Sequence, residues 1–160
     1  MQRFDQIYSE HVAAVRAYVR RRAPEDVVDD LVADVFLVCW RKLDEVPAQA
    51  LPWLYAVARN TLANERRRLA RRAYVPEDVS HEPEPIGDAV LAAAFAELSD
   101  ADREVLRLVA WEGLSVRGAA RVLECSPVAC RVRYHRAKSR LGAKLAAAAS
   151  FRREPRGVTR

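Results

Sequence analysis

The sequence predicts an all-α protein: two small helical domains joined by a flexible acidic linker, the second being a helix-turn-helix domain. Apolar residues recur every three or four positions through most of the chain, which is the spacing of one helix face. This pattern stops between 73 and 86, where prolines and acidic side chains gather. Charge divides the chain near the same place, because residues 1–72 carry a net charge of +3, residues 73–98 carry −6 and residues 99–160 carry +8. Two basic parts on either side of an acidic one indicate that both ends contact a polyanion.

The first predicted domain begins with two helices. The first runs from Phe4 to about Arg22 and ends in three arginines. Cations suit the negative end of a helix dipole, so these arginines support a helix end at this point. The second is expected from Pro24 to about Leu43, because proline is favoured at the first helical position and acidic residues follow it. Its apolar residues cover more than one stripe, so we expect it to pack against two neighbours or to offer a surface to a partner.

Several aspartates lie along the second helix. Asp26, Asp30 and Asp34 are four positions apart and share one side, and Asp29 lies alongside. Like charges at this spacing repel each other by about a few tenths of a kcal/mol per pair. A basic partner would remove this repulsion and is the favoured interpretation. An acidic face that only meets solvent is the alternative.

A third helix is expected to begin near Pro52 and to run to 72. Asn60 and Asn64 stand one turn apart on it, and it then becomes strongly basic. Its arginines are Arg59, Arg66, Arg67, Arg68, Arg71 and Arg72. Amide and guanidinium groups beside aromatic side chains can bind unstacked bases and backbone phosphates.

The second predicted domain opens with a helix from about Asp88 to Leu98. Another helix follows Ser99, whose side chain is expected to cap it, and Asp102 takes the acidic position of a capping box. Gly113 ends this second helix, because glycine readily adopts the backbone conformation found just past a helix end.

Residues 114–141 have the pattern of a helix-turn-helix unit. Ser115 is expected to cap its first helix, and the second starts after Ser126 with Pro127 at the first position. The inward stripe of the second helix is Cys130, Tyr134, Ala137 and Leu141. The basic residues lie largely off that stripe and are Arg131, Arg133, His135, Arg136, Lys138 and Arg140. Such a helix suits the DNA major groove, where arginine donates paired hydrogen bonds to guanine, although a merely solvated basic face is the alternative.

Other classes of protein find little support in the sequence. The chain has no apolar run near the length that spans a bilayer, and its first residues lack the apolar centre of a secretory signal, so we expect a cytoplasmic protein without membrane insertion. Its three cysteines and three histidines lack metal-ligand spacing, and the cysteines are interpreted as buried, reduced thiols. We expect no metal and no cofactor.

Three segments together resemble the bacterial extracytoplasmic-function (ECF) sigma factors, members of the sigma-70 family. They are DDLVADVFLVCWRKLDEV, PWLYAVARNTLANERRR and LSDADREVLRLVAWEGLSVRGAARVLECSPVACRVRYHRAKSRL, and the resemblance covers about Phe4 to Leu145. It implies a region 2-like domain at 1–72, a linker at 73–86, a region 4-like domain at 87–149 and a tail at 150–160.

The resemblance also implies partners and a role for each domain. The first domain would bind core RNA polymerase and melt the promoter −10 element, the second would read the −35 element, and an anti-sigma factor is a further partner. The implied polymerase-binding residues are Asp29, Asp30, Asp34 and Phe36. Those implied for the −10 element are Asn60, Asn64, Arg66 and Arg67, and those for the −35 element are Arg131, Arg133, His135 and Arg136.

Two other functions remain open on the sequence alone. A transcriptional regulator would bind duplex DNA through the helix-turn-helix without directing polymerase, its first domain being a sensor or dimerisation module. The basic helix with Asn60 and Asn64 argues against this, because a sensor needs no base-binding surface. An enzyme is the third possibility, but the sequence has no glycine-rich phosphate loop, no nucleophile with a base at usable spacing and no paired carboxylates in a plausible pocket.

Overall fold

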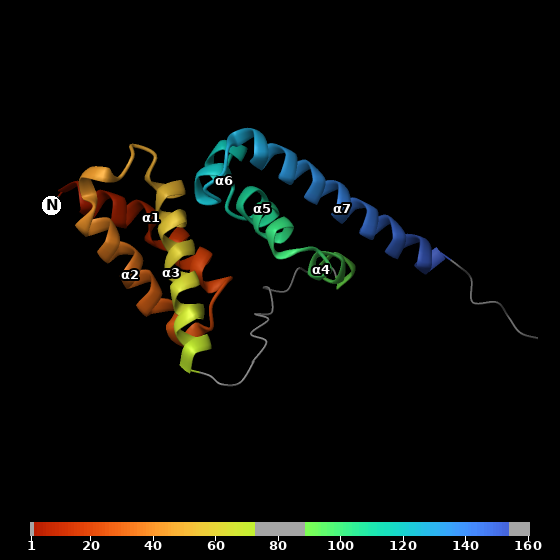
Figure 1. Cartoon of the computed structure of the whole chain (residues 1–160), viewed down its shortest axis with the longest axis horizontal. Coiled ribbons are helices and arrows are strands. Elements are labelled where there is room, and N and C mark those ends of the chain that lie inside the picture. The colour runs from red at the N-terminus through yellow and green to blue at the C-terminus, as the bar shows by residue number, and fades with distance from the viewer. Residues whose placement is uncertain (1, 73–88, 154–160) are drawn as a thin grey trace, which may run out of the picture.

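The computed structural model describes residues 2–72 and 89–153, and within these ranges all regular structure is helical. An N-terminal bundle comprises α1 (Gln2–Arg20), α2 (Val28–Arg41) and α3 (Ala50–Arg72). A C-terminal bundle comprises α4 (Ala89–Ala96), α5 (Asp100–Ala110), α6 (Val116–Val122) and α7 (Pro127–Arg153). The predicted all-α fold class is confirmed (Figure 1). The predicted linker at 73–86 and the last part of the predicted tail lie outside the described residues.

The N-terminal bundle packs all three of its helices against one another. Its centre is built from side chains with almost no exposed surface, among them Val15, Val35 and Leu54. Tyr18 of α1 stacks on Tyr55 of α3, with ring centroids 4.6 Å apart and an interplanar angle of 19°. Because α2 contacts both α1 and α3, its wide apolar face covers two neighbours, as the sequence predicted.

Short 3-10 turns lie on either side of α2. Glu25–Val27 forms the first, so α2 begins at Val28 and not at Pro24. The second turn, Leu43–Glu45, joins α2 to the loop before α3.

The C-terminal bundle is organised on α7, which contacts α4, α5 and α6. Serine side chains cap the N-termini of α5 and α6. Ser99 Oγ accepts a hydrogen bond from Asp102 N (3.2 Å), and Ser115 Oγ accepts one from Gly118 N (3.1 Å). The two capping predictions are confirmed. Gly113 follows α5 with φ +64°, a left-handed conformation that costs glycine little, and the chain turns there into α6.

The role predicted for Asp102 is wrong. Its side chain is buried, and it accepts a hydrogen bond from Arg140 Nη1 of α7 at 2.5 Å instead of reaching back to the start of α5. A buried carboxylate needs a cation or several donors, and α7 delivers one at this point. Arg140 therefore holds α7 to α5.

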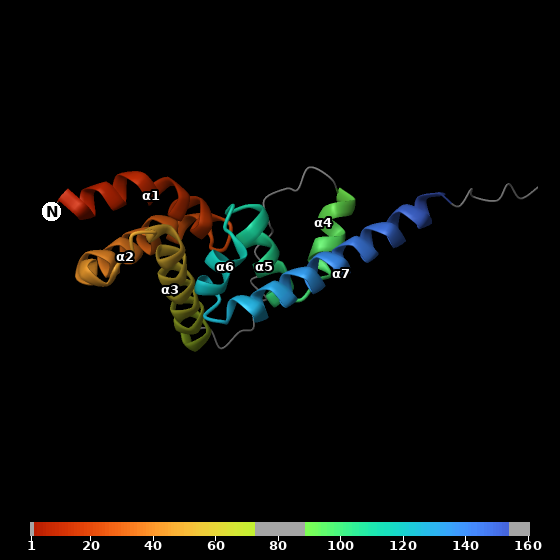
Figure 2. The same ribbon diagram turned by 90° about the horizontal axis from the view of Figure 1, so that it is seen from above.

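The two bundles lie side by side, with α3 of the first against α6 of the second (Figures 1 and 2). The long helix α7 continues well past α5 and reaches Arg153. The second helix predicted for the helix-turn-helix unit therefore continues through the alanine-rich segment.

Candidate nucleic-acid interface

The first part of α7 carries an exposed basic surface. Ser126 Oγ accepts a hydrogen bond from Ala129 N (3.1 Å), which fixes the start of the helix. Cys130 and Ala137 are fully buried against the bundle, so the side of α7 opposite to them faces outward. The predicted residues Arg131, His135 and Arg136 are exposed and Arg133 is half-buried.

Two apolar side chains lie in the middle of this outward surface. Val128 is 73% exposed and Val132 is 43% exposed, in the first two turns of α7. They are four positions apart, so they share one face, and Arg136 continues that row. Sequence reasoning missed both valines as candidate contacts, although their position opposite the buried stripe was a signal that could have found them. In a major groove, apolar side chains contact the methyl group of thymine.

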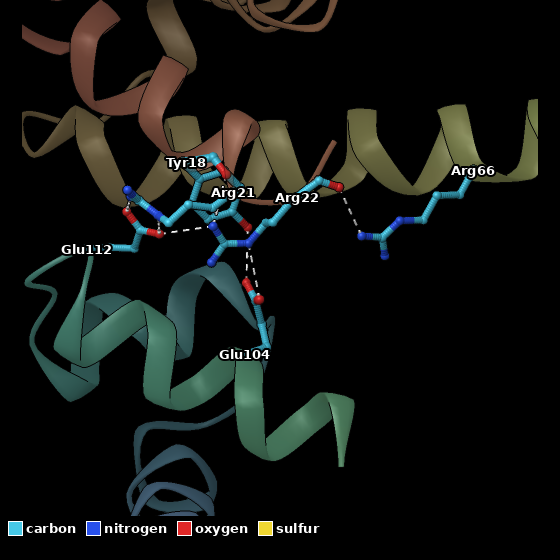
Figure 3. A network of polar contacts seen from close by, with 6 residues as sticks. All are labelled: Tyr18, Arg21, Arg22, Arg66, Glu104 and Glu112. Carbon is cyan, nitrogen blue, oxygen red and sulfur yellow. Dashed lines mark hydrogen bonds and ion pairs between the residues drawn. The ribbon is translucent and has the colours of Figure 1, made fainter. Parts of the chain in front are cut away.

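The second candidate surface lies on α3. Asn60 and Asn64 are both exposed, and Asn64 Oδ1 accepts a hydrogen bond from Arg67 Nη2 at 2.8 Å. Asn60 and Asn64 stand one turn apart, as the sequence predicted, and Arg67, three positions after Asn64, shares their face of the helix. Arg66 is six positions after Asn60, which places it about 240° further round the helix at 3.6 residues per turn. Its Nη2 donates to the carbonyl of Arg22 (3.4 Å), so it points toward the end of α1 (Figure 3).

The acidic surface of α2 is exposed as expected. Asp30 and Asp34 face solvent, and Asp29, also exposed, pairs with Arg16 of α1 at 2.5 Å. Exposed Leu37, at 45%, lies among these aspartates on the helix face. An acidic surface with an apolar centre suits a basic helical partner.

Phe36 does not belong to that surface, and the prediction that it makes a direct polymerase contact is not supported by its position. It is only 4% exposed, because Phe4 and Tyr8 of α1 cover it, with ring centroids 6.4 Å and 4.8 Å away. The aromatic side chain that does reach the surface of α2 is Trp40, at 49% exposure. The periodicity of a helix with a wide apolar face does not reveal which of its sides a neighbour covers.

An ion-pair network joins the two bundles (Figure 3). Arg22 donates from Nε to Glu104 Oε2 (3.2 Å) and from Nη1 to Glu112 Oε1 (3.0 Å). Arg21 Nη2 pairs with Glu112 Oε2 at 2.5 Å, and the hydroxyl of Tyr18 donates to Glu104 Oε1 at 3.2 Å. In the sequence these arginines are recognisable only as cations at a helix end, because no local pattern shows that their side chains reach the other bundle.

The centre of this network is buried, whereas Arg21 and Glu104 at its edges are partly exposed. The side chain of Glu112 is 1% exposed and that of Arg22 is 5% exposed. The guanidinium of Arg22 lies 3.7 Å above the ring of Tyr18. Burial raises the pKa of Tyr18 far above its usual value, and although the Arg22 charge opposes this shift, the nearby Glu104 and Glu112 add to it. Burial, with Glu112 adding to it, raises the pKa of Tyr55 to about 12.

The cysteines are free and separate from these surfaces. Cys39 and Cys130 are buried and Cys125 is half-buried. Burial raises the pKa of Cys39 and of Cys130, which disfavours the reactive thiolate. Among the described side chains, no group of three histidines, cysteines, aspartates or glutamates could hold a metal ion. Nor does any helix in the described ranges have the length and apolar character needed to cross a membrane.

Comparison with known proteins identifies the family. Residues 7–72 match the family described as Sigma-70 region 2, and residues 89–141 match Sigma-70, region 4. The RNA polymerase sigma factor CnrH of Cupriavidus metallidurans is 30% identical, over 89% of this chain and 86% of its own. The chain belongs to the ECF sigma factors of the sigma-70 family. The ECF RNA polymerase sigma factor EcfG of Rhodopseudomonas palustris is likewise 31% identical, over 84% of this chain and 80% of its own.

Two solved structures agree with this assignment. One is CnrH in complex with the cytosolic domain of CnrY, which is 30% identical to this sigma factor and matches it with a TM-score of 0.63. The match covers 92% of this chain and 90% of CnrH. The other is the sigma factor RpoE of Bartonella quintana in complex with the anti-sigma factor NepR, which is 25% identical and matches with a TM-score of 0.68. This match covers 91% of this chain and 98% of RpoE.

The family also decides between the functions that the sequence left open. The chain is a sigma factor that binds core RNA polymerase and promoter DNA and directs promoter-specific initiation. A regulator that only binds duplex DNA is excluded, because the N-terminal bundle corresponds to region 2 and not to a sensor. Sigma factors are transcription initiation factors.

Proposed function

We propose that the two bundles divide promoter recognition between them. The C-terminal bundle, within the predicted domain 87–149, reads the −35 element with the outward face of α7. The N-terminal bundle, within 1–72, captures the −10 element with Asn60, Asn64 and Arg67. The observation that carries this proposal is the surface of α7, where exposed guanidinium groups and two exposed valines lie opposite a fully buried stripe.

On α7, the predicted residues would have different tasks. Arg131, His135 and Arg136 surround the exposed valines and point outward, which supports base-edge contacts in the major groove as their proposed task. Arg133 is half-buried and lies to the side of this face, where a phosphate contact fits better.

On α3, the proposed contact is with single-stranded DNA. Melting costs a few kcal/mol per unstacked step, which capture of a base can offset, each stacked base being worth about 1–3 kcal/mol. Asn60 and Asn64 can hydrogen-bond the edge of a displaced base, and Arg67 is held beside Asn64 to meet its phosphate. Arg66 would contribute less, since its guanidinium points toward Arg22.

The acidic surface of α2 is the proposed polymerase contact. Asp29, Asp30 and Asp34 would meet basic side chains of the polymerase, and Leu37 would be buried among them. An anti-sigma factor, the kind of partner seen with RpoE, would compete for surfaces of this kind. Since the polymerase and the promoter lie in the cytoplasm, the sigma factor would act there, without a catalytic residue, metal or cofactor of its own.

Run-off transcription with purified core polymerase tests the proposal. We expect Asn60→Ala and Arg131→Ala each to lower transcript yield by about 5-fold to 150-fold at limiting sigma factor, as loss of about 1–3 kcal/mol of DNA contact requires. Arg131→Ala should weaken binding to a −35 duplex, whereas Asn60→Ala should leave that binding unchanged and reduce permanganate reactivity of −10 thymines.

Arg20→Ala is the matched control for these substitutions. Arg20 is exposed and pairs with nearby Glu25 (3.0 Å), its one ion-pair partner within the described ranges 2–72 and 89–153, so its loss should leave the transcript yield within about two-fold of wild type. Transcription by Asn60→Ala at the wild-type level would contradict the assignment of α3 to the −10 element.

The valines of α7 allow a test at the level of one methyl group. If Val128 or Val132 contacts thymine, replacing that thymine by deoxyuridine should weaken −35 binding by about 3-fold to 5-fold, since one buried methyl is worth about 0.8 kcal/mol. Val132→Ala should remove the difference between the two duplexes at that position. Equal binding of thymine and deoxyuridine duplexes by wild type, at every position of the element, would show that these valines read no methyl group.

A further inference from the structure

We propose that Cys125 and Cys130 form an oxidation-sensitive pair of thiols at the start of α7, that a hydroperoxide joins them in a disulfide, and that this disulfide weakens the binding of α7 to duplex DNA. The pairing of the two thiols rests on their positions in the fold. Its consequence for the −35 element rests on the proposed function.

The two cysteines occupy two positions whose side chains meet at a helix start. Ser126 caps α7, because its Oγ accepts a hydrogen bond from Ala129 N (3.1 Å) and its carbonyl accepts one from Cys130 N (2.9 Å). Cys125 therefore directly precedes the cap, and Cys130 is the fourth residue of the helix. Apolar side chains at these two positions pack together and fix the direction in which the chain enters a helix. In α7 both members of this contact are thiols.

The packing of the bundle brings the two thiols together. Cys130 has no exposed surface, and Cys125 packs against the same core. A hydrogen bond joins the two side chains. Cys39, the third cysteine of the chain, is buried on α2 of the other bundle. A disulfide within one molecule of this protein therefore joins Cys125 to Cys130.

Exposure sets the order in which the thiols react. Cys125 is half-buried, so a peroxide reaches it, whereas Cys130 is covered. Burial raises the pKa of Cys130, and the adjacent Cys125 adds to this rise, so Cys130 keeps its proton in the reduced protein. Cys125 is therefore the thiol that attacks the peroxide, and Cys130 is the thiol that resolves the oxidised form of Cys125.

The reaction balances with one hydrogen peroxide. The Cys125 thiolate attacks one peroxide oxygen, the O–O bond breaks, and the hydroxide that leaves takes up the proton that Cys125 has lost. The product is a sulfenic acid. The Cys130 sulfur then attacks the Cys125 sulfur, the S–O bond breaks, and the leaving hydroxide takes the Cys130 proton. Two thiols and one peroxide give one disulfide and two water molecules, so the two electrons removed from sulfur reduce the peroxide.

The disulfide changes the start of α7. It holds its two Cβ atoms about 3.5–4.5 Å apart and fixes the torsion between them, a constraint that two hydrogen-bonded thiols do not have. The turn before α7 has little freedom to absorb the resulting shift, because Glu124 already has φ +51° and Cys125 N donates to Ala120 O (3.0 Å). The displacement therefore reaches the first turns of α7, which carry Val128 and Arg131.

The modification is reversible. A thiol reductant cleaves a disulfide by attack on an accessible sulfur, which here is that of Cys125. Reduction restores the thiol contact and with it the start of α7. Promoter binding would thus fall only while the peroxide outpaces the reductant.

Mass spectrometry of the full chain tests the thiol pair. The tryptic peptide 122–131 contains Cys125 and Cys130 and no other cysteine. After treatment with hydrogen peroxide and alkylation of the remaining thiols, we expect this peptide to be lighter than its reduced, unalkylated form by two hydrogen atoms. Cys130→Ala should instead leave a sulfenic acid at Cys125, which dimedone traps. Cys125→Ser should leave Cys130 unmodified.

Fluorescence anisotropy measures the consequence, on a −35 duplex from a promoter that the reduced protein transcribes. We expect oxidised wild type to bind this duplex about 10-fold more weakly than reduced wild type, as for the loss of one base contact, and dithiothreitol to restore the affinity. Cys125→Ser is the matched control, because serine keeps the size of the side chain and forms no disulfide, so peroxide should change its affinity by less than about two-fold. Circular dichroism checks that oxidised wild type keeps its helices.

The outcomes separate this inference from the proposed function. A wild-type peptide 122–131 that stays reduced in excess peroxide would overturn the pairing of the thiols. A disulfide without any loss of duplex binding, or an equal loss in Cys125→Ser, would overturn its effect on α7. If the disulfide forms but reduced Arg131→Ala binds the duplex as tightly as wild type does, the assignment of the −35 contact fails and the thiol pair stands.

Discussion

Phe95→Ala should destabilise the C-terminal bundle by about 3–5 kcal/mol, the usual cost of truncating a buried phenylalanine. Phe95 is 1% exposed and anchors α4, which is only eight residues long and too short to be stable alone. Its ring lies 5.4 Å from that of Trp111. With the anchor removed, α4 should lose much of its packing on the bundle. The hydrogen bond from Arg103 Nη1 to the carbonyl of Ala96 (2.6 Å) and the pair of Lys144 Nζ with Glu97 Oε2 (2.6 Å) are exposed and stabilise its end only weakly.

A loss of this size is comparable with the whole stability expected of a bundle of about 65 residues. The measurement is urea unfolding followed by tryptophan fluorescence, because Trp111 loses its aromatic neighbour, and by circular dichroism at 222 nm. Leu69→Ala provides the control: Leu69 is exposed on α3, so its truncation should change stability by no more than about 0.5 kcal/mol. A Phe95→Ala protein with wild-type unfolding would mean that α4 contributes nothing to the bundle.

Local sequence signals predicted the helices and their ends. Ser99 and Ser115 were identifiable as caps because a serine before an apolar-periodic segment has one favourable use, and both side chains accept the expected backbone hydrogen bond. The inward stripe of α7 was identifiable because Cys130 and Ala137 recur at helical spacing. These features depend on residues within about one turn of each other.

Contacts between elements could not be predicted in the same way. Asp102 fits a capping box in sequence, but a guanidinium 38 positions later takes its carboxylate. Phe36 lies on one of several apolar stripes of α2, and only the packing of α1 decides that it is covered while Leu37 is not. The local sequence identifies Arg22 only as a cation at a helix end, because its partner Glu104 lies on α5. In each case the deciding partner is distant in sequence.

Raising the pH from 10 to 12 should destabilise the protein, with Tyr55 contributing about 2 kcal/mol. Tyr55 is buried, and its pKa in the folded chain is about 12, against a usual value of 10.0. Since the folded state holds the phenol proton more tightly than the unfolded state does, the stabilisation is complete below pH 10 and declines as the pH rises toward the folded pKa. By pH 11 the loss due to this one side chain should reach about 1.4 kcal/mol.

The measurement is the free energy of unfolding in urea at pH 9, 10 and 11, for wild type and Tyr55→Phe. Phenylalanine keeps the stack on Tyr18 and has no proton to lose, so the variant should gain about 1.4 kcal/mol relative to wild type between pH 9 and 11. Tyr8→Phe, at an exposed position on α1, should follow the wild-type curve. Comparing variants cancels the titration of the lysines.

Tyr18 should extend the effect to the interface between the bundles. Its pKa is raised by burial and by its proximity to Glu104 and Glu112, so an ionised Tyr18 would place a third negative charge beside those two. Its hydroxyl also loses the proton that it donates to Glu104. At high pH the particle should therefore expand in scattering before the helical signal is lost, and Tyr18→Phe should delay that expansion. Simultaneous loss of compactness and helicity in both proteins would mean that the interface and the bundles open as one unit.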